Sequence, residues 1–334
     1  MAASVFTRRT CGFVLDGFGS PDVLRLAERP TPVPAAGEVL VDVDVAGVNF
    51  GDTMIRRGEY LRNQPLSMAP GTEVVGHVAA VGPGADHAVG TRVAGWLEAG
   101  GGYADRVIVP AHRVYPVPDD LPSAAIAAVF IQGVTAAYAI HRFGWTSTGD
   151  HVLVLGAGGG VGGLALQLAK AAGATAIGAA SSEAKRAVVL ANGAAAALDS
   201  SDPDRLTERV REITVGHGVD VVVDGVGGPL FGPSLRALAP RGRYVVVGAA
   251  TQQPAMLDVR HLLVRNQSVC GFIIAHVADE DPAEPGRTLQ ELCDLVRRGE
   301  LKPRYEVKPL EDAPDVHRRI EDRSLTGKVI LEVR

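Results

Sequence analysis

The sequence predicts an α/β protein with two domains, an antiparallel β domain and a doubly wound parallel sheet. The chain has 334 residues, more than one hydrophobic core ordinarily holds. Short valine-rich runs punctuated by Gly or Pro fill its first third, without crossover helices between them. From Asp150 onward, strand-like and helix-like segments alternate, which is typical of a parallel sheet covered by helices on both faces.

The first third of the chain predicts an antiparallel barrel or sandwich. Its strand-like segments are EVLVDVDVAGVN (38–49), EVVGHVAAVG (73–82), TRVAGW (91–96) and YADRVIVPAHRV (103–114). An alanine-rich helix is expected to follow Pro122, with Ser123 as its N-cap.

The second half of the chain predicts parallel strands with helical stretches between most of them. The expected strands are Val152–Leu155, Ala174–Ala180, Val219–Asp224, Arg243–Gly248 and Ser268–Ile274. The tail, residues 301–333, returns to a strand–helix–strand pattern.

Composition excludes several classes of protein. Net charge is −5, which gives no electrostatic reason to expect nucleic acid or an anionic membrane as a partner. Three widely spaced cysteines indicate reduced thiols in a cytoplasmic protein. No apolar run reaches 18 residues without a charge, Gly or Pro, so no membrane span is expected. Residues 1–10 lack an apolar core, which predicts a frayed extension and not a secretory signal.

One stretch, HVLVLGAGGGVGGLALQLAKAAGA (151–174), contains seven glycines, six of them at the junction of a buried strand and a helix and the seventh, Gly173, at the end of that helix. Bare backbone lets a diphosphate approach the helix N-terminus, where free N–H groups and the helix dipole favour anions. We expect Gly159, Gly160, Val161 and Gly162 to face that diphosphate. The dinucleotide fingerprint fits in two registers, 158/160/163 and 157/159/162, and a glycine turn without a ligand is the alternative.

The residues after the next strand indicate which dinucleotide binds. An NAD site places an acid at the end of that strand for the ribose hydroxyl, but here the strand ends in Ala179 and Ala180. Four polar residues follow, and they favour the 2′-phosphate of NADPH: Ser181, Ser182, Lys185 and Arg186. An ordinary helix capped by Ser181 or Ser182 is the alternative, and both interpretations can hold together.

Five motifs resemble the medium-chain dehydrogenase/reductase superfamily: GAGGGVG, GVNFGDTMIRRGEY, PGTEVVGHVAAVG, QGVTAAY and TGKVILEV. They are most similar to its quinone oxidoreductase, or zeta-crystallin-like, branch, and cover residues 12–334. The resemblance implies a GroES-like β-barrel catalytic domain at 1–128 and 275–334 and a Rossmann domain at 129–274. It also implies a homodimer, in which the strand NQSVCGFII (266–274) pairs with its symmetry mate.

The resemblance also predicts that the chain binds no metal. Zinc-dependent relatives carry ligands at the positions of Asn49, Thr72 and Ile131, and these three side chains cannot replace thiolate and imidazole. Without zinc to stabilise an alkoxide, hydride transfer suits acceptors that spread their own charge, such as quinones and conjugated enones.

Further site residues follow from the resemblance. Thr135 matches a threonine on the nicotinamide carboxamide, although a threonine bonded to its own helix is the alternative. Arg323 matches a basic residue near the adenosine phosphate, or is a solvated charge. Ser200 stands where the family has a tyrosine, which puts that contact in doubt. The loops that contain Gly248 and Phe272 are expected to hold the cofactor at the carboxyl ends of strands.

Three residues are expected on the substrate side. Asn49 is predicted to donate a hydrogen bond to the acceptor oxygen, so that Asn49→Ala lowers turnover while NADPH binding survives. Tyr60 is predicted to stack on a flat ring or offer its phenol, and Asp52 to fix the loop. A reductase of C=C double bonds is the alternative enzyme, and an NADPH-binding protein with little turnover is the alternative from another class.

Overall fold

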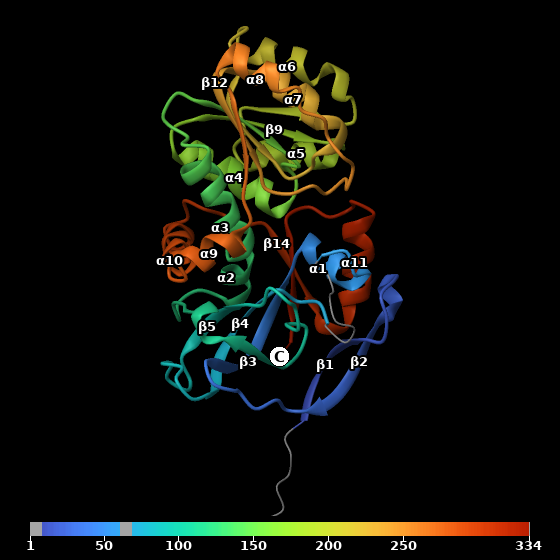
Figure 1. Cartoon of the computed structure of the whole chain (residues 1–334), viewed down its shortest axis with the longest axis vertical. Helices are drawn as coiled ribbons and strands as arrows, with labels where there is room; N and C mark the ends of the chain where they lie inside the picture. Colours follow the sequence, from blue (N-terminus) through green and yellow to red (C-terminus); the bar gives the residue numbers. More distant parts are fainter. Residues whose placement is uncertain (1–8, 61–68, 334) are drawn as a thin grey trace, which may run out of the picture. The chain divides into compact units, whose positions relative to one another are not determined.

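The computed structural model describes residues 9–60 and 69–333, and it divides into two compact units (Figure 1). Unit 1 consists of Met1–Ile131 and Tyr305–Arg334, and unit 2 of Gln132–Arg304. The N-terminal extension that the sequence predicts at residues 1–8 lies outside the described residues.

Unit 1 is built on a seven-stranded sheet in the order β14-β15-β3-β4-β5-β7, with β6 paired to β3, and on a separate β1–β2 pair. The strands are β1 (Arg9–Leu15), β2 (Leu24–Pro30), β3 (Glu38–Val48), β4 (Glu73–Val81), β5 (Arg92–Trp96), β6 (Arg106–Pro110), β7 (Val114–Pro116), β14 (Tyr305–Pro309) and β15 (Lys328–Glu332). The helices are α1 (Phe50–Arg57), α2 (Ser123–Val129) and α11 (Ala313–Glu321), with short helical turns at η1 (Pro21–Val23), η2 (Ala111–Arg113) and η6 (Leu310–Asp312).

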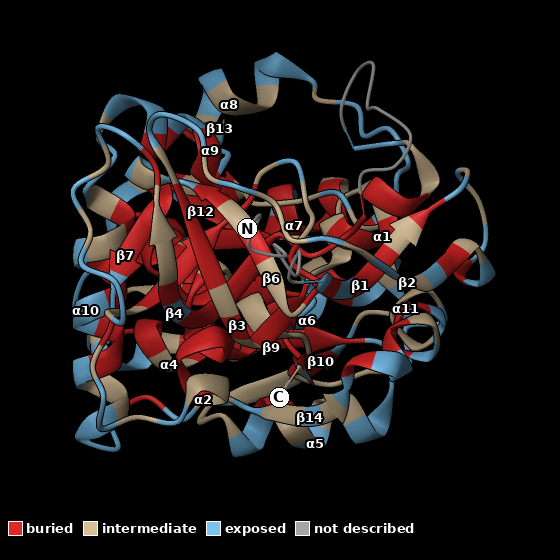
Figure 2. Ribbon diagram, turned by 90° about the horizontal axis from the view of Figure 1, so that it is seen from below, coloured by how far each residue is buried: buried red, intermediate tan, exposed pale blue. Residues whose placement is uncertain are grey.

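Strand β3 organises unit 1 because it pairs with three neighbours. It is antiparallel to β4, to β6 and to β15, so the last strand of the chain lies against one of the first. The side chains of Val39, Val41 and Val43 alternate into the core and are fully buried. Figure 2 shows β3 and β4 mostly in red, with the exposed surface concentrated on helices and loops.

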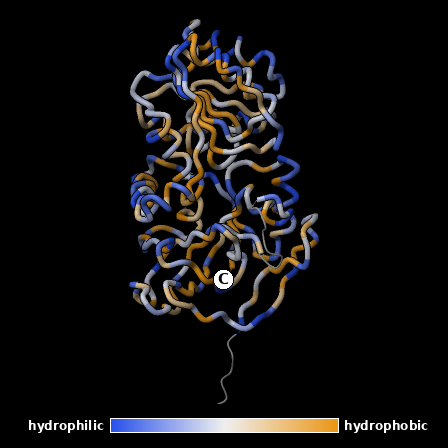
Figure 3. The backbone as a smooth tube through the Cα atoms, viewed as in Figure 1, coloured by the Kyte–Doolittle hydropathy of each residue, from blue (hydrophilic) through white to orange (hydrophobic). Residues whose placement is uncertain are grey.

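Unit 2 is a six-stranded parallel sheet in the order β10-β9-β8-β11-β12-β13. This is the order of a doubly wound dinucleotide-binding sheet. The strands are β8 (His151–Leu155), β9 (Thr175–Ala180), β10 (Ala196–Asp199), β11 (Val219–Asp224), β12 (Leu238–Val246) and β13 (Ser268–Gly271). The parallel strands converge as a group of hydrophobic orange segments in Figure 3, as expected for strands buried on both faces.

Helices connect the strands of unit 2, and further helical segments precede β8 and follow β13. They are α3 (Ile131–Ala137, whose first residue belongs to unit 1), the π-helical turn η3 (Tyr138–Phe143), α4 (Gly160–Ala171), α5 (Glu183–Ala191), α6 (Leu206–Ile213), α7 (Phe231–Ala237), α8 (Val259–Arg265), α9 (Ile274–Glu280) and α10 (Glu284–Arg297). The short turns η4 (Pro203–Arg205) and η5 (Gly228–Leu230) precede α6 and α7.

The boundary between the units differs from the one that the sequence suggested. Residues 275–304, expected with the catalytic domain, belong to unit 2. Their contacts explain the difference, because Arg142 pairs with Glu284 at 3.2 Å. The side-chain amide of Gln167 also accepts from the backbone N–H of Lys302 (2.8 Å) and donates to its carbonyl (3.1 Å).

Several local predictions need correction. Ser123 is the first residue of α2 and not its N-cap: Pro122 holds the cap position, and the Ser123 hydroxyl donates to Asp44 and accepts from Arg92. Strand β13 ends at Gly271, and α9 begins at Ile274. Strand β12 begins five residues before Arg243, and the four-residue strand β10 had no distinct sequence pattern.

One described segment, Ser123–Phe143, is long and apolar enough to cross a membrane. However, 72% of its most apolar 18-residue window is buried inside the protein, and the segment is divided among α2, α3 and η3. This segment therefore forms part of the protein core.

Candidate functional site

The turn between β8 and α4 settles the register of the glycine motif. A Cβ atom placed on Gly162 would lie only 2.6 Å from the carbonyl oxygen of Gly156 and 2.7 Å from the Cα of Ala157. Gly162 is therefore the residue that lets α4 approach the end of β8, which selects the register 157/159/162. A Cβ on Gly159 would meet nothing closer than 3.4 Å, so this residue, the N-cap of α4, presents open backbone.

Two side chains lie against this glycine turn. The stem of Lys185 lies over Gly158, with its Cβ, Cγ and Cδ atoms 3.1–3.5 Å from where a Cβ of residue 158 would be. The side-chain oxygen of Gln132 lies 1.6 Å from where a Cβ of Gly160 would be, so Gly160 leaves room for this amide. We did not predict a role for Gln132 from the sequence, although it is the first residue of the QGVTAAY motif. Nothing in a single sequence indicates that Gln132 contacts Gly160.

The end of β9 keeps the polar set that the sequence predicts. Ser181 and Ser182 are exposed, and the Ser182 hydroxyl caps α5 by accepting from the backbone N–H of Lys185 at 3.3 Å. The helix-cap interpretation is thus confirmed for Ser182. Arg186 points to the end of β10, where it pairs with Asp199 at 3.0 Å and donates to the carbonyl of Ala180.

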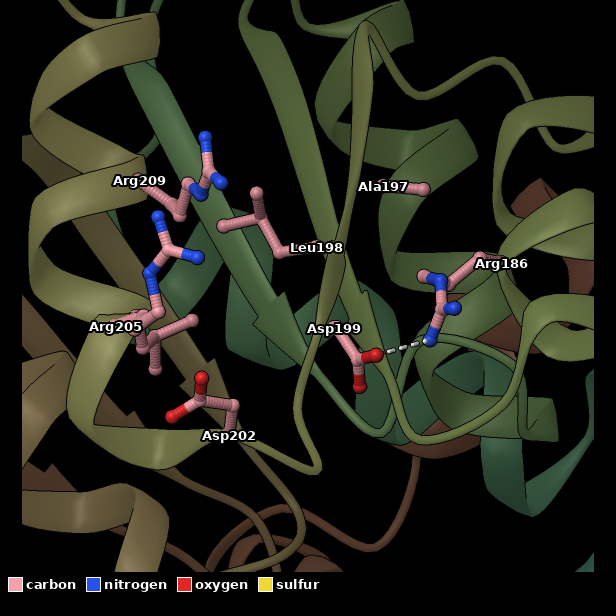
Figure 4. A pocket seen from close by; sticks show the side chains of 8 residues that line it. Arg186, Ala197, Leu198, Asp199, Asp202, Arg205 and Arg209 are labelled. Carbon is pink, nitrogen blue, oxygen red and sulfur yellow. Dashed lines mark ion pairs between the residues drawn. The ribbon is translucent and has the colours of Figure 1, made fainter.

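A pocket of about 400 Å³ adjoins Arg186 along the edge strand β10 (Figure 4). Leu198 and Leu206 supply apolar wall, and Arg205 and Arg209 come from the opposite side to Arg186. Hydrogen bonds from Ser201, and then the charge of Arg186, lower the pKa of Asp199, so this carboxylate is ionised beside the arginine. Arg186 is thereby engaged within the protein, whereas Lys185 lies directly at the glycine turn.

The loops after β11 and β12 are held together at the carboxyl edge of the sheet. The buried carboxylate of Asp224 accepts from the N–H groups of Val226 and Gly227 and from the Tyr244 hydroxyl at 2.7–2.9 Å. Thr251 in turn donates to Val226 through both its N–H and its hydroxyl. Gly248 lies here, where a Cβ would come within 3.3 Å of Gly225.

Phe272, in the loop after β13, packs against the helical segment that carries Thr135. Its ring is stacked on Phe143 with centroids 4.4 Å apart and lies 6.1 Å from that of Tyr138. Thr135 is half-buried on α3, three residues before η3 begins at Tyr138. The structure thus places the predicted cofactor residues of unit 2 on the glycine turn, between the end of β9 and the start of α5, on α3, and in the loops at the carboxyl ends of the strands.

In unit 1, Asp52 fixes the backbone around the start of α1. Its buried carboxylate accepts from the N–H groups of Asn49 (2.7 Å), Gly71 (3.0 Å) and Thr72 (3.1 Å). Burial raises its pKa to about 6, against the opposing effect of these backbone hydrogen bonds. This agrees with the expectation that Asp52 holds the loop.

The side chain of Asn49 is engaged inside the protein, contrary to the expectation that it donates to a substrate. Its Nδ2 donates to Glu73 Oε1 at 2.7 Å and to Thr72 Oγ1 at 3.1 Å. Its Oδ1 accepts from Lys328 Nζ at 3.1 Å. Both amide hydrogens are therefore used within the protein, so this arrangement leaves neither for the direct hydrogen bond to a substrate that the sequence suggested.

Glu73 and Lys328 form a buried ion pair beside Asn49. Both side chains are at most 1% exposed, and the ammonium contacts Glu73 Oε1. The other carboxylate oxygen accepts from the backbone N–H of Ile131 at 3.1 Å. Gly47 leaves room for this carboxylate, because a Cβ there would lie 2.6–2.8 Å from it. Sequence reasoning missed both residues, since a buried pair 255 positions apart leaves no local pattern.

These contacts test whether zinc fits unit 1. The positions of Asn49, Thr72 and Ile131 do lie close together. The Asn49 amide donates hydrogen bonds to Thr72 and to Glu73, and the backbone N–H of Ile131 donates one to Glu73. They provide an amide, a hydroxyl and an aliphatic side chain, and the Lys328 ammonium already supplies a cation there. This donor set does not fit a tetrahedral zinc ion. Among residues 9–60 and 69–333, no group of three or more His, Cys, Asp or Glu side chains is placed to hold a metal.

The two remaining predicted residues lie at the surface of unit 1. Tyr60 is 37% exposed, and its ring packs against Gly51 of α1. Burial of the rest of the ring, with the charges of Asp52 and Glu98, raises its pKa. Arg323 is exposed after α11 with a left-handed backbone (φ 54°) and donates its N–H to Ile320.

The sequence is similar to known proteins along nearly its whole length. Residues 35–119 match the family described as alcohol dehydrogenase GroES-like domain, and residues 160–289 match zinc-binding dehydrogenase. The synaptic vesicle membrane protein VAT-1 homolog of Rattus norvegicus is 33% identical over 95% of this chain and 83% of its own length. A probable quinone oxidoreductase of Schizosaccharomyces pombe is 34% identical over 94% of each chain.

Solved structures with the same fold include proteins of related kinds. A mycobacterial protein complexed with NADPH superposes with a TM-score of 0.89 at 33% identity, covering 97% of this chain and 100% of its own. The CurK enoyl reductase superposes with a TM-score of 0.85 at 26% identity, covering 97% and 99%.

Proposed function

The chain belongs to the medium-chain dehydrogenase/reductase superfamily, in the branch of the quinone oxidoreductases, and from this premise we propose that it reduces quinones or other conjugated carbonyl compounds with NADPH and without zinc. Membership makes the protein an oxidoreductase and confirms the expected GroES-like and Rossmann domains. The cofactor, the acceptor and the independence from zinc are the proposed parts.

The bare turn between β8 and α4 is the observation that carries the proposal. It offers the unpaired N–H groups of a twelve-residue helix to a diphosphate, with Gly159 open and the Lys185 stem alongside. Gly159, Gly160, Val161 and Gly162 would hold the diphosphate of the cofactor. Bound NADPH supplies a hydride at its nicotinamide ring.

The 2′-phosphate of NADPH is proposed to lie at the end of β9. Ser181, Ser182 and Lys185 offer hydroxyls and an ammonium there, and β9 ends without an acid for an unphosphorylated ribose. Arg186 contributes less than the sequence suggested because Asp199 engages its guanidinium. Thr135, Gly248 and Phe272 would position the nicotinamide and ribose, and Arg323 the adenosine phosphate.

The proposed acceptors follow from the donor set of unit 1. The hydroxyl of Thr72 stands where zinc-dependent relatives have a ligand, and so does the amide of Asn49, whose hydrogens are bound within the protein. Lys328 already places a positive charge beside them. Hydrogen bonds stabilise a phenolate or enolate whose charge is delocalised, which quinones and enones provide. Tyr60 can present an aromatic surface to such a flat ring.

The proposal is tested by titrating the purified chain with NADPH and NADH, and then following NADPH oxidation with 1,4-benzoquinone and 9,10-phenanthrenequinone. We expect saturable NADPH binding, tighter than that of NADH, and quinone-dependent oxidation that persists after dialysis against a zinc chelator. Failure to bind NADPH, or loss of turnover on chelation with recovery on adding zinc, contradicts the proposal.

An enoyl reductase activity is the second candidate, and the likeness to the CurK enoyl reductase favours it. Product analysis on a simple enone distinguishes the two activities, because a saturated ketone forms only by reduction of the C=C bond. Saturable NADPH binding without turnover of quinones, enals or enoyl thioesters would instead favour a binding protein.

We also propose that the protein is a cytoplasmic homodimer. Strand β13 is the edge of the six-stranded sheet, and its backbone can pair with that of a second copy around a two-fold axis. Apolar side chains next to it in the sequence support the assignment, because Leu263 and Val264 of α8 are about four-fifths exposed, at 79% and 81%.

A further inference from the structure

We infer that the hydroxyl of Thr72 is the hydrogen-bond donor to the acceptor's oxygen, and that Lys328 and Asn49 polarise it through a chain of hydrogen bonds. The inference deepens the proposed function and depends on it. It assigns to Thr72 the donor role that we expected of Asn49 from the sequence, where Thr72 was noted only as the position of a zinc ligand in relatives.

The orientation of the Asn49 amide fixes the direction of the chain. Lys328 Nζ can only donate, so the amide group facing it is the oxygen Oδ1, at 3.1 Å. The Nδ2 group must then face Glu73 and Thr72, where it finds a carboxylate oxygen at 2.7 Å and a hydroxyl oxygen at 3.1 Å. The Asn49 side chain therefore accepts a hydrogen bond at Oδ1 and donates hydrogen bonds from Nδ2.

Thr72 stands at the end of this chain with its own proton unused. Its Oγ1 accepts from Asn49, its N–H donates to Asp52, and its carbonyl accepts from Leu97 N. No described residue accepts a hydrogen bond from the hydroxyl, although Thr72 is only 6% exposed. A hydroxyl that accepts one hydrogen bond and has no internal acceptor can offer its hydrogen to a bound oxygen.

The charges behind Thr72 strengthen it as a donor. The Lys328 ammonium withdraws electron density from the Asn49 carbonyl, which makes the amide a stronger donor to Thr72 Oγ1. That bond in turn makes the Thr72 hydroxyl a stronger donor toward an oxygen that gains negative charge during hydride transfer. Glu73 balances the ammonium, so the buried pair of Lys328 and Glu73 carries no net charge.

Thr72→Val removes the hydroxyl with little change in volume, and Thr72→Ser retains it. We expect Thr72→Val to lower kcat/KM for the quinone or enone by roughly a hundred-fold, the usual cost of losing a donor to a developing oxyanion. Thr72→Ser is expected to remain within about five-fold of wild type, since the donor is still present. NADPH affinity, measured by fluorescence titration, should not change in either variant.

Thr53→Val is the matched control. Thr53 is a fully buried threonine nearby, and its hydroxyl already donates to the carbonyl of Phe50 at 2.7 Å. Its loss should affect stability without lowering kcat/KM to a comparable degree. If Thr72→Val does not fold, Thr72→Ala serves as the hydroxyl-free variant.

A double-mutant cycle separates the relay from two independent donors. If Asn49 acts through Thr72, Asn49→Ala combined with Thr72→Val loses no more activity than the worse single variant. Multiplicative losses, or a Thr72→Val enzyme within five-fold of wild type, would overturn the inference. A wild-type chain that turns over no quinone or enone would instead refute the proposed function, and the inference with it.

Discussion

At the scale of the residue, burial decides which predicted groups keep the role that the sequence suggested. Asp52 was expected to hold its loop, and three backbone N–H groups on its carboxylate agree with that. Asn49 was expected to face a substrate, but its amide is engaged by Lys328, Glu73 and Thr72. The sequence showed that Asn49 is a polar residue at this position, but its hydrogen-bond partners come from segments far apart in the sequence and could not be predicted.

A second buried pair predicts a pH dependence of stability. His317 is fully buried, and its Nε2 lies 3.1 Å from the Tyr103 hydroxyl. Burial, followed by the charges of Arg56 and Arg57, lowers its pKa to about 3 from the ordinary 6.5. Below pH 6.5 the unfolded chain therefore takes up a proton that the native protein does not, so this contribution to stability is lost as pH falls toward 3.

We expect the free energy of unfolding of wild type, minus that of His317→Gln, to decrease by roughly 1.4 kcal/mol per pH unit between pH 6 and 4. Urea denaturation at several pH values measures it. Asp52→Asn is the opposite control, because the raised pKa of Asp52 makes the native protein bind a proton first and favours it as pH falls through the same range. Parallel pH curves for wild type and His317→Gln would contradict the assignment.

At the scale of the element, the glycine turn between β8 and α4 predicts opposite effects for neighbouring substitutions. Gly162→Ala would bring a methyl group within 2.6–2.7 Å of the backbone of Gly156 and Ala157. For Gly163→Ala the nearest atom would be the side-chain amide nitrogen of Asn192 at 2.9 Å, which can move, and the nearest backbone atom is the carbonyl oxygen of Ala157 at 3.9 Å, an ordinary contact. We expect Gly162→Ala to destabilise the protein by about 1–3 kcal/mol and to weaken NADPH binding.

Gly163→Ala is expected to be neutral or to stabilise α4 by up to about 1 kcal/mol, because alanine favours helix over glycine. Thermal unfolding with and without NADPH measures both variants. Equal effects of the two substitutions would show that 157/159/162 is not the register of the turn.

Much of the fold and part of the site could be predicted because the signals were local. Alternating valines marked β3 and β4, and the apolar run before the glycines marked β8. The register of the glycine motif could not be predicted, since both alternatives fit the same letters and only the helix–strand contact distinguishes them. Gln132, Glu73 and Lys328 were missed because each acts on a residue distant in sequence.

At the scale of the whole molecule, the open edge of the six-stranded sheet predicts the oligomeric state. We expect light scattering to give about twice the chain mass of 34.8 kDa. Leu263→Asp should shift the protein toward monomer, since it places a charge on the exposed apolar face of α8. Val215→Asp is the control, because Val215 is 93% exposed in the same unit but lies in the turn after α6. A monomeric wild type would exclude the dimer.

The buried pair of Lys328 and Glu73 also limits how this scaffold can be redesigned. Grafting cysteine and histidine ligands onto positions 49, 72 and 131 alone would place a divalent ion beside a fixed ammonium, two like charges in a dry interior. A designer who wanted a metalloenzyme here would also have to replace Lys328 with an uncharged residue. Conversion of this site to a metal site therefore takes four substitutions and not three.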